Sequence, residues 1–438
     1  MAQFIVEGGK QLHGSISVTG NKNEALPLIA ASLLCADPIA LYNSPDIVDV
    51  RTMLEIAEHL GTRVKKNKPG IISLHTPSIE KTELPLMLSS QIRASILFAS
   101  ALLARTGQAI IPQPGGDSIG RRRLDTHFLV FEHLGAKLKI QRKVDERGLQ
   151  TTAYVLEAPK GITGASIYLD EASVTATENA LILASAAKGK TTIANAASEP
   201  HVQGLCHFLK QMGVKIKGVG SNMLTVYGTD QFTPAEHVVG SDYIEAASFI
   251  GLAAATRSSI TVTNINTQIM RMILFQFERI GVVVENDYKK RMIHVPEKQP
   301  LTIKKDLGSV IPKIEDSPWP GFPADLVSIL LVVATQSRGT CLIHEKMFEA
   351  RLFFVDKLLS MGAQIVLCDP HRAVIVGPSP LYGASISSPD IRAGMALLIA
   401  ALAAEGQSHI QNIDQIDRGY QNIDIRLQSL GAQITRKE

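Results

Sequence analysis

A helix-like segment that ends in Leu-Gly, Met-Gly or Ile-Gly and runs into an alternating apolar stretch occurs six times in this 438-residue chain. The six glycines are Gly61, Gly135, Gly213, Gly281, Gly362 and Gly431, and 438/6 gives a mean unit of 73 residues. Each glycine lies where a helix would end, because the left-handed turn there carries little steric cost for glycine. One such segment is common in any α/β protein, whereas six at a near-constant period indicate a repeat architecture.

Each unit also has a second helix, rich in Ala, Leu and Ile and poor in charge, which predicts burial on most sides. With the turn and strand that follow, these segments span 23–43, 91–111, 177–195, 242–264, 324–344 and 390–412. A unit therefore reads as strand, buried helix, strand, amphipathic helix, strand. Six units fit an α/β fold of two pseudo-symmetric three-unit domains, with the helices inside and the sheets outside. The candidate join lies near Gly228–Glu236.

The composition excludes several classes of protein. Hydrophobic residues at 45% and charged residues at 19% exclude a disordered chain. The net charge of +3, from 44 Lys+Arg against 41 Asp+Glu, does not indicate a nucleic-acid binder. Four scattered cysteines lack CxxC spacing, which argues against a zinc site and a disulfide framework. We expect no metal and no cofactor. Without a signal peptide or an apolar run of the roughly 18–20 residues of a membrane span, we expect a soluble cytoplasmic protein of undetermined oligomeric state.

Charged residues recur at or just before the starts of the predicted buried helices. They are Lys22, Arg93, Glu178, Asp242 with Glu245, Asp325, and Asp390 with Arg392. A helix start favours an anion by ~0.3–1 kcal/mol, and arginine binds phosphate and carboxylate bidentately. If the helix starts face one cleft, Lys22, Arg93 and Arg392, with Arg351 and Arg418, would suit a ligand with both groups. Each arginine by itself is more readily explained as a solvated surface charge, so the hypothesis rests on the set.

The segment 112–123, PQPGGDSIGRRR, predicts a loop, because its prolines and glycines exclude a helix or a central strand. It carries Asp117 and three consecutive arginines, which favours either a mobile lid over an anionic substrate or a solvated basic loop. A nucleic-acid patch is disfavoured because no aromatic residues interleave the arginines. The GKT at 189–191 lies between a helix and a strand, the reverse of a phosphate-binding loop, and predicts a plain turn.

Ten short motifs, in order along nearly the whole chain, resemble one known family. They are GNKNEALP (20–27), DVRTM (49–53), QIRAS (91–95), PGGDSIGRR (114–122), ATEN (176–179), PGFPADL (320–326), FEAR (348–351), DIRAG (390–394), AAEG (403–406) and IDRGYQNI (416–423). Together they resemble the enolpyruvyl transferases. The resemblance implies two inside-out α/β domains, one at 21–236 carrying the loop 112–123 and one at 1–20 with 237–438, and an active site in the cleft between them.

The resemblance also implies a reaction and its residues. The 3-hydroxyl of UDP-N-acetylglucosamine would add to phosphoenolpyruvate and phosphate would leave, the first committed step of peptidoglycan precursor synthesis. Lys22, Arg122 and Arg418 would hold the phosphate, Arg351, Arg392 and Arg418 the carboxylate, and Asn23 would lie beside the reacting centre. The UDP-sugar would contact Arg93, the stretch Arg122, Arg123, Leu124, Asp125 and Thr126, the stretch 171–174 with Ser173 and Val174, and Asp325 and Met347.

The chemistry needs a proton on the methylene carbon of phosphoenolpyruvate while the sugar hydroxyl loses one. An acid and a base on opposite sides of a cationic cage supply both. The catalytic residues implied are Asp117 as the lid acid and Asp325 as the base, with Lys22 and Arg418 as cations. Asp390 is a second acid that would orient groups or shuttle protons.

Several residues depart from the family pattern. Asp117 replaces the usual lid cysteine, the thiol that the epoxide fosfomycin alkylates, so we expect no inactivation by fosfomycin. Arg123, Thr175 and Tyr243 replace Pro, Gly and Arg on the nucleotide side, so phosphoenolpyruvate is better supported than the acceptor. The alternatives are another nucleotide sugar, shikimate 3-phosphate, or an inactive paralogue or scaffold. Shikimate 3-phosphate is disfavoured because QIRAS lacks a GNAGT-type glycine loop. An inactive scaffold is disfavoured because the chain retains the whole set of Lys22, Asp325, Arg351, Arg392 and Arg418.

Overall fold

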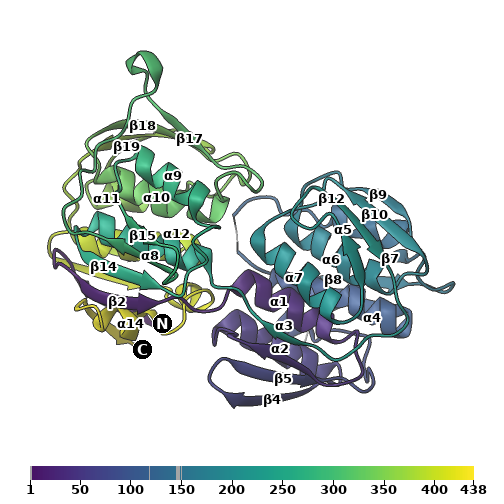
Figure 1. The fold of residues 1–438 in the computed structure, drawn as a ribbon. Helices are drawn as coiled ribbons and strands as arrows, with labels where there is room; N and C mark the ends of the chain where they lie inside the picture. The colour runs from purple at the N-terminus through teal and green to yellow at the C-terminus, as the bar shows by residue number, and fades with distance from the viewer. Residues whose placement is uncertain (1, 118, 145–147, 149) are drawn as a thin grey trace. The chain divides into compact units, whose positions relative to one another are not determined.

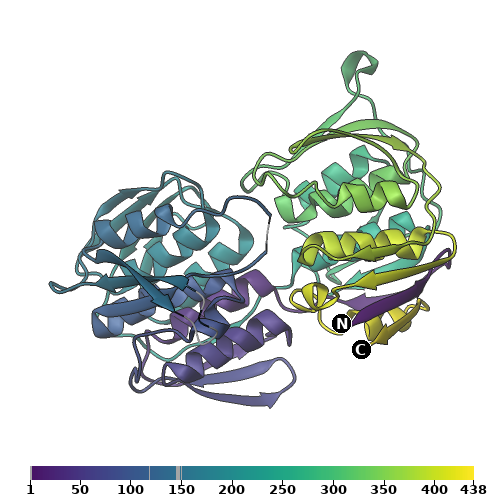
Figure 2. The same ribbon diagram turned by 180° about the vertical axis from the view of Figure 1, so that it is seen from behind.

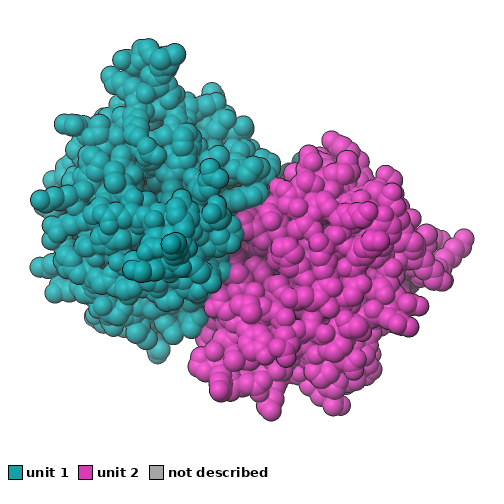
Figure 3. Space-filling view, viewed as in Figure 1, with its two compact units in different colours: residues 1–19, 118–122, 241–438 teal, residues 20–117, 123–240 magenta. Residues whose placement is uncertain are grey.

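The computed structural model describes residues 2–117, 119–144, 148 and 150–438, which fall into two compact units (Figure 3). Unit 1 comprises Met1–Thr19, Ser118–Arg122 and Ser241–Glu438, and unit 2 comprises Gly20–Asp117 and Arg123–Gly240. The short segment 118–122 is thus grouped with unit 1, although the residues on both sides of it belong to unit 2. No helix in the described ranges is long and apolar enough to cross a membrane.

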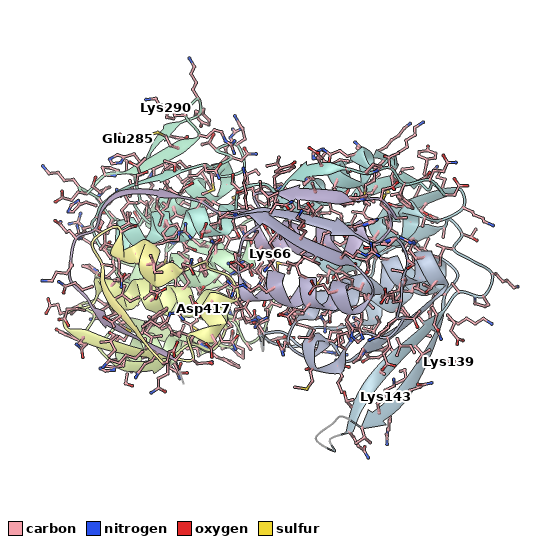
Figure 4. The ribbon with its side chains drawn as sticks, turned by 90° about the horizontal axis from the view of Figure 1, so that it is seen from below. Lys66, Lys139, Lys143, Glu285, Lys290 and Asp417 are labelled. Atoms are coloured by element: carbon pink, nitrogen blue, oxygen red, sulfur yellow. The ribbon has the colours of Figure 1, made fainter. Side chains whose placement is uncertain are left out.

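Among the described residues, three sheets form the outside of unit 2. Their strand orders are β13 (Glu236–Val238), β3 (Ile39–Tyr42), β5 (Ile71–His75), β4 (Arg63–Lys68); β6 (Gln108–Pro112), β8 (Gln150–Glu157), β7 (Lys137–Val144); and β11 (Lys215–Lys217), β12 (Met223–Tyr227), β10 (Lys190–Ala194), β9 (Ser166–Tyr168). Most side chains of β4 and β7 are exposed, including Lys66 and Lys139 (Figure 4), so one face of these sheets is solvated.

Three further sheets, counted over the described part of the chain, belong to unit 1. Their orders are β15 (Glu285–Asp287), β16 (Met292–Val295), β14 (Ser259–Thr263), β2 (His13–Ser17); β17 (Lys313–Glu315), β18 (Gly339–His344), β20 (Arg372–Gly377), β19 (Gln364–Asp369); and β21 (Ser385–Ser387), β22 (Gln407–Gln411), β1 (Gln3–Glu7), β23 (Gln433–Lys437). Strand β1 pairs with β22 and with β23, so the first and last strands of the chain lie side by side (Figures 1 and 2).

The inner layer of each unit consists of the apolar helices that the sequence predicts. In unit 2 they are α1 (Lys22–Ser32), η1 (Arg93–Leu97) running into α4 (Phe98–Thr106), and α6 (Val174–Ser185). In unit 1 they are α8 (Tyr243–Ala255), η3 (Ala324–Leu326) running into α10 (Val327–Thr335), and α12 (Ile391–Ala403). Helices α8, α10 and α12 contact one another pairwise (Figure 1), and every residue of α8 and α10 is buried. The inside-out α/β fold is therefore confirmed.

Amphipathic helices complete the units: α2 (Val48–His59), α5 (Asp125–His133), α7 (Pro200–Gln211), α9 (Arg271–Arg279), α11 (Val355–Ser360) and α14 (Ile423–Gln428). The six repeat glycines follow them with φ values of 111°, 105°, 96°, 89°, 101° and 96°, in chain order, all in the left-handed region. The predicted helix ends are confirmed, and glycine is there because a side chain would be strained.

A recurring asparagine marks a corner at the end of a strand in four of the described sheets. Asn43, Asn195, Asn264 and Asn412 each follow the strand after a buried helix, with φ between 56° and 59°. Each side-chain amide donates to the carbonyl oxygen just after the parallel edge strand of its sheet, at 2.8–2.9 Å, the acceptors being Val239, Leu169, Val18 and Ser388. This link ties the ends of two parallel strands together.

Candidate active site

Unit 1 places one carboxylate between two buried arginines. Asp325 lies in η3, Arg351 ends the turn after β18, and Arg392 lies in the first turn of α12. Asp325 accepts a hydrogen bond from Arg351 Nη2 through Oδ1 and one from Arg392 Nε through Oδ2, the latter at 3.2 Å. Asp390 caps α12 by accepting the backbone N–H groups of Arg392 and Ala393 at 2.8 and 3.0 Å. This cap fixes the position of Arg392 in the first turn of the helix.

Both guanidinium groups are held in the charged state. Burial opposes the charge of Arg351 and Arg392, but it is outweighed by Asp325 together with Asp390 and Glu345 at Arg351, and with Tyr420 and Asp242 at Arg392, so the pKa of each arginine is raised. Arg392 also lies over the Tyr420 ring at 5.6 Å, and its Nη1 donates to the Tyr420 hydroxyl at 3.4 Å. The cluster therefore presents fixed positive charge in a poorly solvated place, which suits an anionic ligand.

Two of the three guanidinium nitrogens of Arg351 are buried without a hydrogen-bond acceptor among the described residues. Its Nη1 lies 3.7 Å from an Asp390 carboxylate oxygen, but neither Nε nor Nη1 makes a hydrogen bond with any described residue. A buried donor without an acceptor costs about 1–3 kcal/mol. A carboxylate or phosphate beside Arg351 would remove that cost, so these atoms mark a place for a ligand anion.

The turn 345–351 also receives the predicted lid. Glu349 Oε2 accepts the backbone N–H of Arg121 at 3.0 Å, and the Ala350 N–H donates to the Ile119 carbonyl at 3.2 Å. Gly120 has φ +119°, and a Cβ there would lie 2.3 Å from Glu349 Oε2. Residues 113–124 contain no helix or strand where the structure describes them, as expected for the loop.

The remaining predicted residues of unit 1 lie on neighbouring segments. Met347 is 37% exposed in the same turn as Arg351. Arg418 follows the short helix α13 (Asp414–Asp417), partly buried, and its Nη1 donates to Gln415 Oε1 at 2.9 Å. Arg122 is partly buried at the end of the docked segment.

Unit 2 carries a buried ion pair at the start of α1. Lys22 Nζ lies 2.5 Å from Asp49 Oδ2, and both side chains are less than a tenth exposed. Asn21 caps the helix, so Lys22 and Asn23 occupy its first turn, where the backbone N–H groups favour an anion. Asp117 also belongs to unit 2 and is partly buried.

A second group of predicted residues forms a network in unit 2. Arg93 Nη2 donates to the Arg123 carbonyl at 2.6 Å, and the Arg123 guanidinium reaches Asp125 at 3.0 Å and Asp170 at 3.4 Å. Thr126 donates to Asp170 at 2.7 Å. The hydrogen bond to Asp125 raises the pKa of Arg123.

Other predicted residues of unit 2 flank this network. Leu124 is buried next to Arg123, and Ser173 caps α6, of which Val174 is the first residue. At the departure Thr175, the hydroxyl contacts His127 Nε2 at 3.2 Å.

The structure thus gathers the predicted residues into two sets. Asp325, Arg351, Asp390 and Arg392 meet in unit 1, and Arg93 meets the stretch 123–126 in unit 2. Sequence reasoning missed the partners Asp49, Asp170, Glu349 and Tyr420. Three of these lie inside or beside the quoted motifs DVRTM, FEAR and IDRGYQNI, which is the signal that could have found them.

Comparison with known proteins identifies the family. The family model described as EPSP synthase (3-phosphoshikimate 1-carboxyvinyltransferase) matches residues 6–427. The chain belongs to this enolpyruvyl transferase family. It is 51% identical over 438 residues, all of both chains, to a UDP-N-acetylglucosamine 1-carboxyvinyltransferase of Treponema denticola. It is 51% identical to the Bradyrhizobium diazoefficiens protein of the same name, over 99% of this chain and 98% of that one.

Solved structures show the same fold at low identity. The enolpyruvyl transferase NikO from Streptomyces tendae matches with a TM-score of 0.85 and 21% identity, over 100% of this chain and 99% of that one. EPSP synthase from Acinetobacter baumannii matches with a TM-score of 0.75 and 17% identity over 100% of both chains. At these identities the likeness concerns the fold alone. The resemblance noted from the sequence motifs is confirmed.

Proposed function

We propose that this protein transfers the enolpyruvyl group of phosphoenolpyruvate to the 3-hydroxyl of UDP-N-acetylglucosamine and releases phosphate. The observation that carries the proposal is the Arg351–Asp325–Arg392 cluster, whose buried guanidinium groups suit a small carboxylate. The full-length relatives at 47–51% identity that are named for this reaction support the same acceptor. We further propose that the enzyme acts in the cytoplasm, on the first committed step of peptidoglycan precursor synthesis.

The carboxylate of phosphoenolpyruvate would bind Arg351 and Arg392, with Arg418 completing the grip. The substrate carboxylate would replace the Asp325 carboxylate as the hydrogen-bond acceptor of the two guanidinium groups, because the two carboxylates are planar acceptors of the same kind. The exchange would leave Asp325 free of one or both hydrogen bonds. A carboxylate that has lost these partners is a stronger base, and it is then able to take the proton of the sugar hydroxyl.

The phosphate of phosphoenolpyruvate would bind Lys22, Arg122 and Arg418. The ion pair between the Asp49 carboxylate and the Lys22 ammonium group restricts the rotamers of the long Lys22 side chain. The first turn of α1 adds backbone N–H groups, and Asn23 follows Lys22 there. The loop 112–123 would bring Arg122 and Asp117 to the same substrate.

The reaction would proceed by addition and then elimination. Asp325 takes the proton of the sugar 3-hydroxyl as its oxygen bonds to C2 of phosphoenolpyruvate, and Asp117 gives a proton to C3. The tetrahedral intermediate then returns a proton from C3 to the Asp117 carboxylate while the bond between C2 and the phosphate oxygen breaks. The double bond re-forms and phosphate leaves, so the methylene group is recovered unchanged.

The nucleotide side of the acceptor would contact Arg93, Arg123, Asp125, Thr126 and the start of α6. A second acceptor, shikimate 3-phosphate, is favoured by the family model's description alone. The deciding experiment measures phosphate release from phosphoenolpyruvate with UDP-N-acetylglucosamine, other UDP-sugars and shikimate 3-phosphate. We expect release with UDP-N-acetylglucosamine. Release with another acceptor only would overturn the proposal.

A further inference from the structure

One sheet of unit 1 replaces the asparagine corner with two acids. Strands β17 and β18 are parallel, with Glu315 opposite His344, and the next residues are Asp316 and Glu345. These are the positions that hold the carbonyl acceptor and the asparagine in the four sheets with the corner. Where Asn264 donates to the Val18 carbonyl, Glu345 therefore faces Asp316.

The two acids hold the following turn. Asp316 accepts the Lys346 N–H at 2.5 Å through Oδ1 and the Met347 N–H at 3.3 Å through Oδ2. Glu345 Oε1 accepts the N–H groups of Met347 and Phe348 at 3.2 and 3.1 Å. The four bonds fix the backbone that leads to Glu349, where the lid segment docks, and to Arg351.

The second oxygen of Glu345 shows where a proton is needed. Asp316 and Glu345 are both fully buried, and no N–H or O–H donor of a described residue reaches Glu345 Oε2. Two buried carboxylates in contact repel, whereas one shared proton turns the contact into an O–H···O⁻ hydrogen bond. In that form Glu345 donates, as the corner asparagines do.

The surroundings favour the protonated form. Burial and the neighbouring Asp316 raise the pKa of Glu345 to about 9, against the opposing charge of Arg351. His371 also packs here, and its Nδ1 lies 2.8 Å from the Glu345 carbonyl oxygen. The Lys346 side chain turns to Glu315, 3.6 Å away.

We propose that Asp316 and Glu345 share one proton and are the positioning pair of the turn 345–351, so that lid docking on Glu349 and the placement of Arg351 depend on that proton. Neither acid touches the reacting atoms. The effect of the shared proton on catalysis rests on the proposed function, whereas its effect on the conformation of the turn 345–351 does not.

The experiment compares Glu345→Gln, which carries a permanent donor of the same size, with Glu345→Ala, which carries none. The readouts are kcat/KM for phosphoenolpyruvate, the rate of tryptic cleavage at the lid arginines, and Tm, each from pH 6 to 10. In the wild type, lid protection and Tm should fall as the pH rises toward 9, because ionisation leaves two adjacent carboxylates. Glu345→Gln should abolish this fall and retain activity.

Glu345→Ala should expose the lid to trypsin at every pH and lower kcat/KM on the order of 100-fold, the loss expected when a binding group shifts by about 1 Å. Asn264→Ala is the matched control. It breaks the equivalent corner in a neighbouring sheet and should lower Tm without changing the pH profile or lid cleavage.

The proposal is wrong if Glu345→Gln keeps the wild-type pH profile of Tm and lid cleavage, or if Glu345→Ala leaves lid cleavage unchanged. Absence of phosphate release by the wild type with every acceptor would overturn the proposed function instead, and the trypsin and Tm measurements would still decide the positioning pair.

Discussion

Glu349 accepts the backbone N–H of Arg121 at 3.0 Å, across 228 positions of sequence. Because the donor is backbone, the contact depends on the path of the loop and not on the arginine side chain. The docking of the loop therefore does not use the Arg121 side chain. The same turn carries Arg351, which joins the docking of the loop to the predicted carboxylate site.

Gly120→Ala should prevent this docking. The added Cβ would lie 2.3 Å from Glu349 Oε2, in a backbone conformation with φ +119° that L side chains rarely adopt. We expect kcat for phosphate release to fall by about 100-fold, the effect of misplacing a closing loop, with Tm changed little. Steady-state kinetics and thermal unfolding measure the two effects.

Gly161→Ala is the control for this prediction. Gly161 also has a positive φ of +77°, but nothing lies within 4 Å of its Cβ position. It should carry the backbone strain without the loss of kcat. Equal loss in both variants would show that the docking contact has no catalytic effect.

Asp325→Asn should separate binding from chemistry. The amide cannot take the proton of the sugar hydroxyl, so kcat should fall by about 10²–10⁴-fold. The carboxylate that competes for Arg351 and Arg392 is removed, so phosphoenolpyruvate should bind at least as tightly as to the wild type. Fluorescence of Trp319, the single tryptophan of the chain and six residues before Asp325, can report binding. Weaker binding with unchanged kcat would contradict the assignment of Asp325 as the base.

Asp49→Asn should weaken the grip on phosphate through Lys22. Removing one partner of a buried ion pair leaves the other uncompensated and costs about 3–5 kcal/mol of stability. We expect a lower Tm and a raised KM for phosphoenolpyruvate, with a smaller effect on the KM for the UDP-sugar. Asp46→Asn, which removes an exposed pair with Arg51, is the control and should change neither. Equal increases in both KM values would indicate general damage to unit 2.

The sequence predicted the fold well because its signals are local. The six glycines indicate left-handed turns at helix ends, and the apolar composition of the inner helices indicates burial. Each of these signals lies within a short stretch of sequence. The partners of the site residues were not predictable in this way. Asp49 meets Lys22 between two helices, and Glu349 meets Arg121 between segments far apart in the chain. Such contacts depend on packing, which no local pattern carries.

The corner asparagines are an intermediate case. The strand ends that contain Asn195 and Asn264 were visible in the sequence, but their meaning depends on a carbonyl in another strand. Only the register of the parallel pair shows that Glu345 stands in the same place as these asparagines. The replacement of the corner asparagine by Glu345 could therefore be recognised only after the structure had shown what the asparagines do.

Asp117→Cys should make the enzyme sensitive to fosfomycin. A thiolate opens an epoxide far faster than a carboxylate, because sulfur is the stronger nucleophile and cysteine beside cations is readily deprotonated. The wild type should retain activity and its unmodified mass after incubation, whereas the variant should gain one inhibitor mass and lose activity. Asp117→Asn should neither react nor turn over, while still binding phosphoenolpyruvate. A covalent adduct on wild-type Asp117, located by peptide mass, would show that the carboxylate is the reactive group after all.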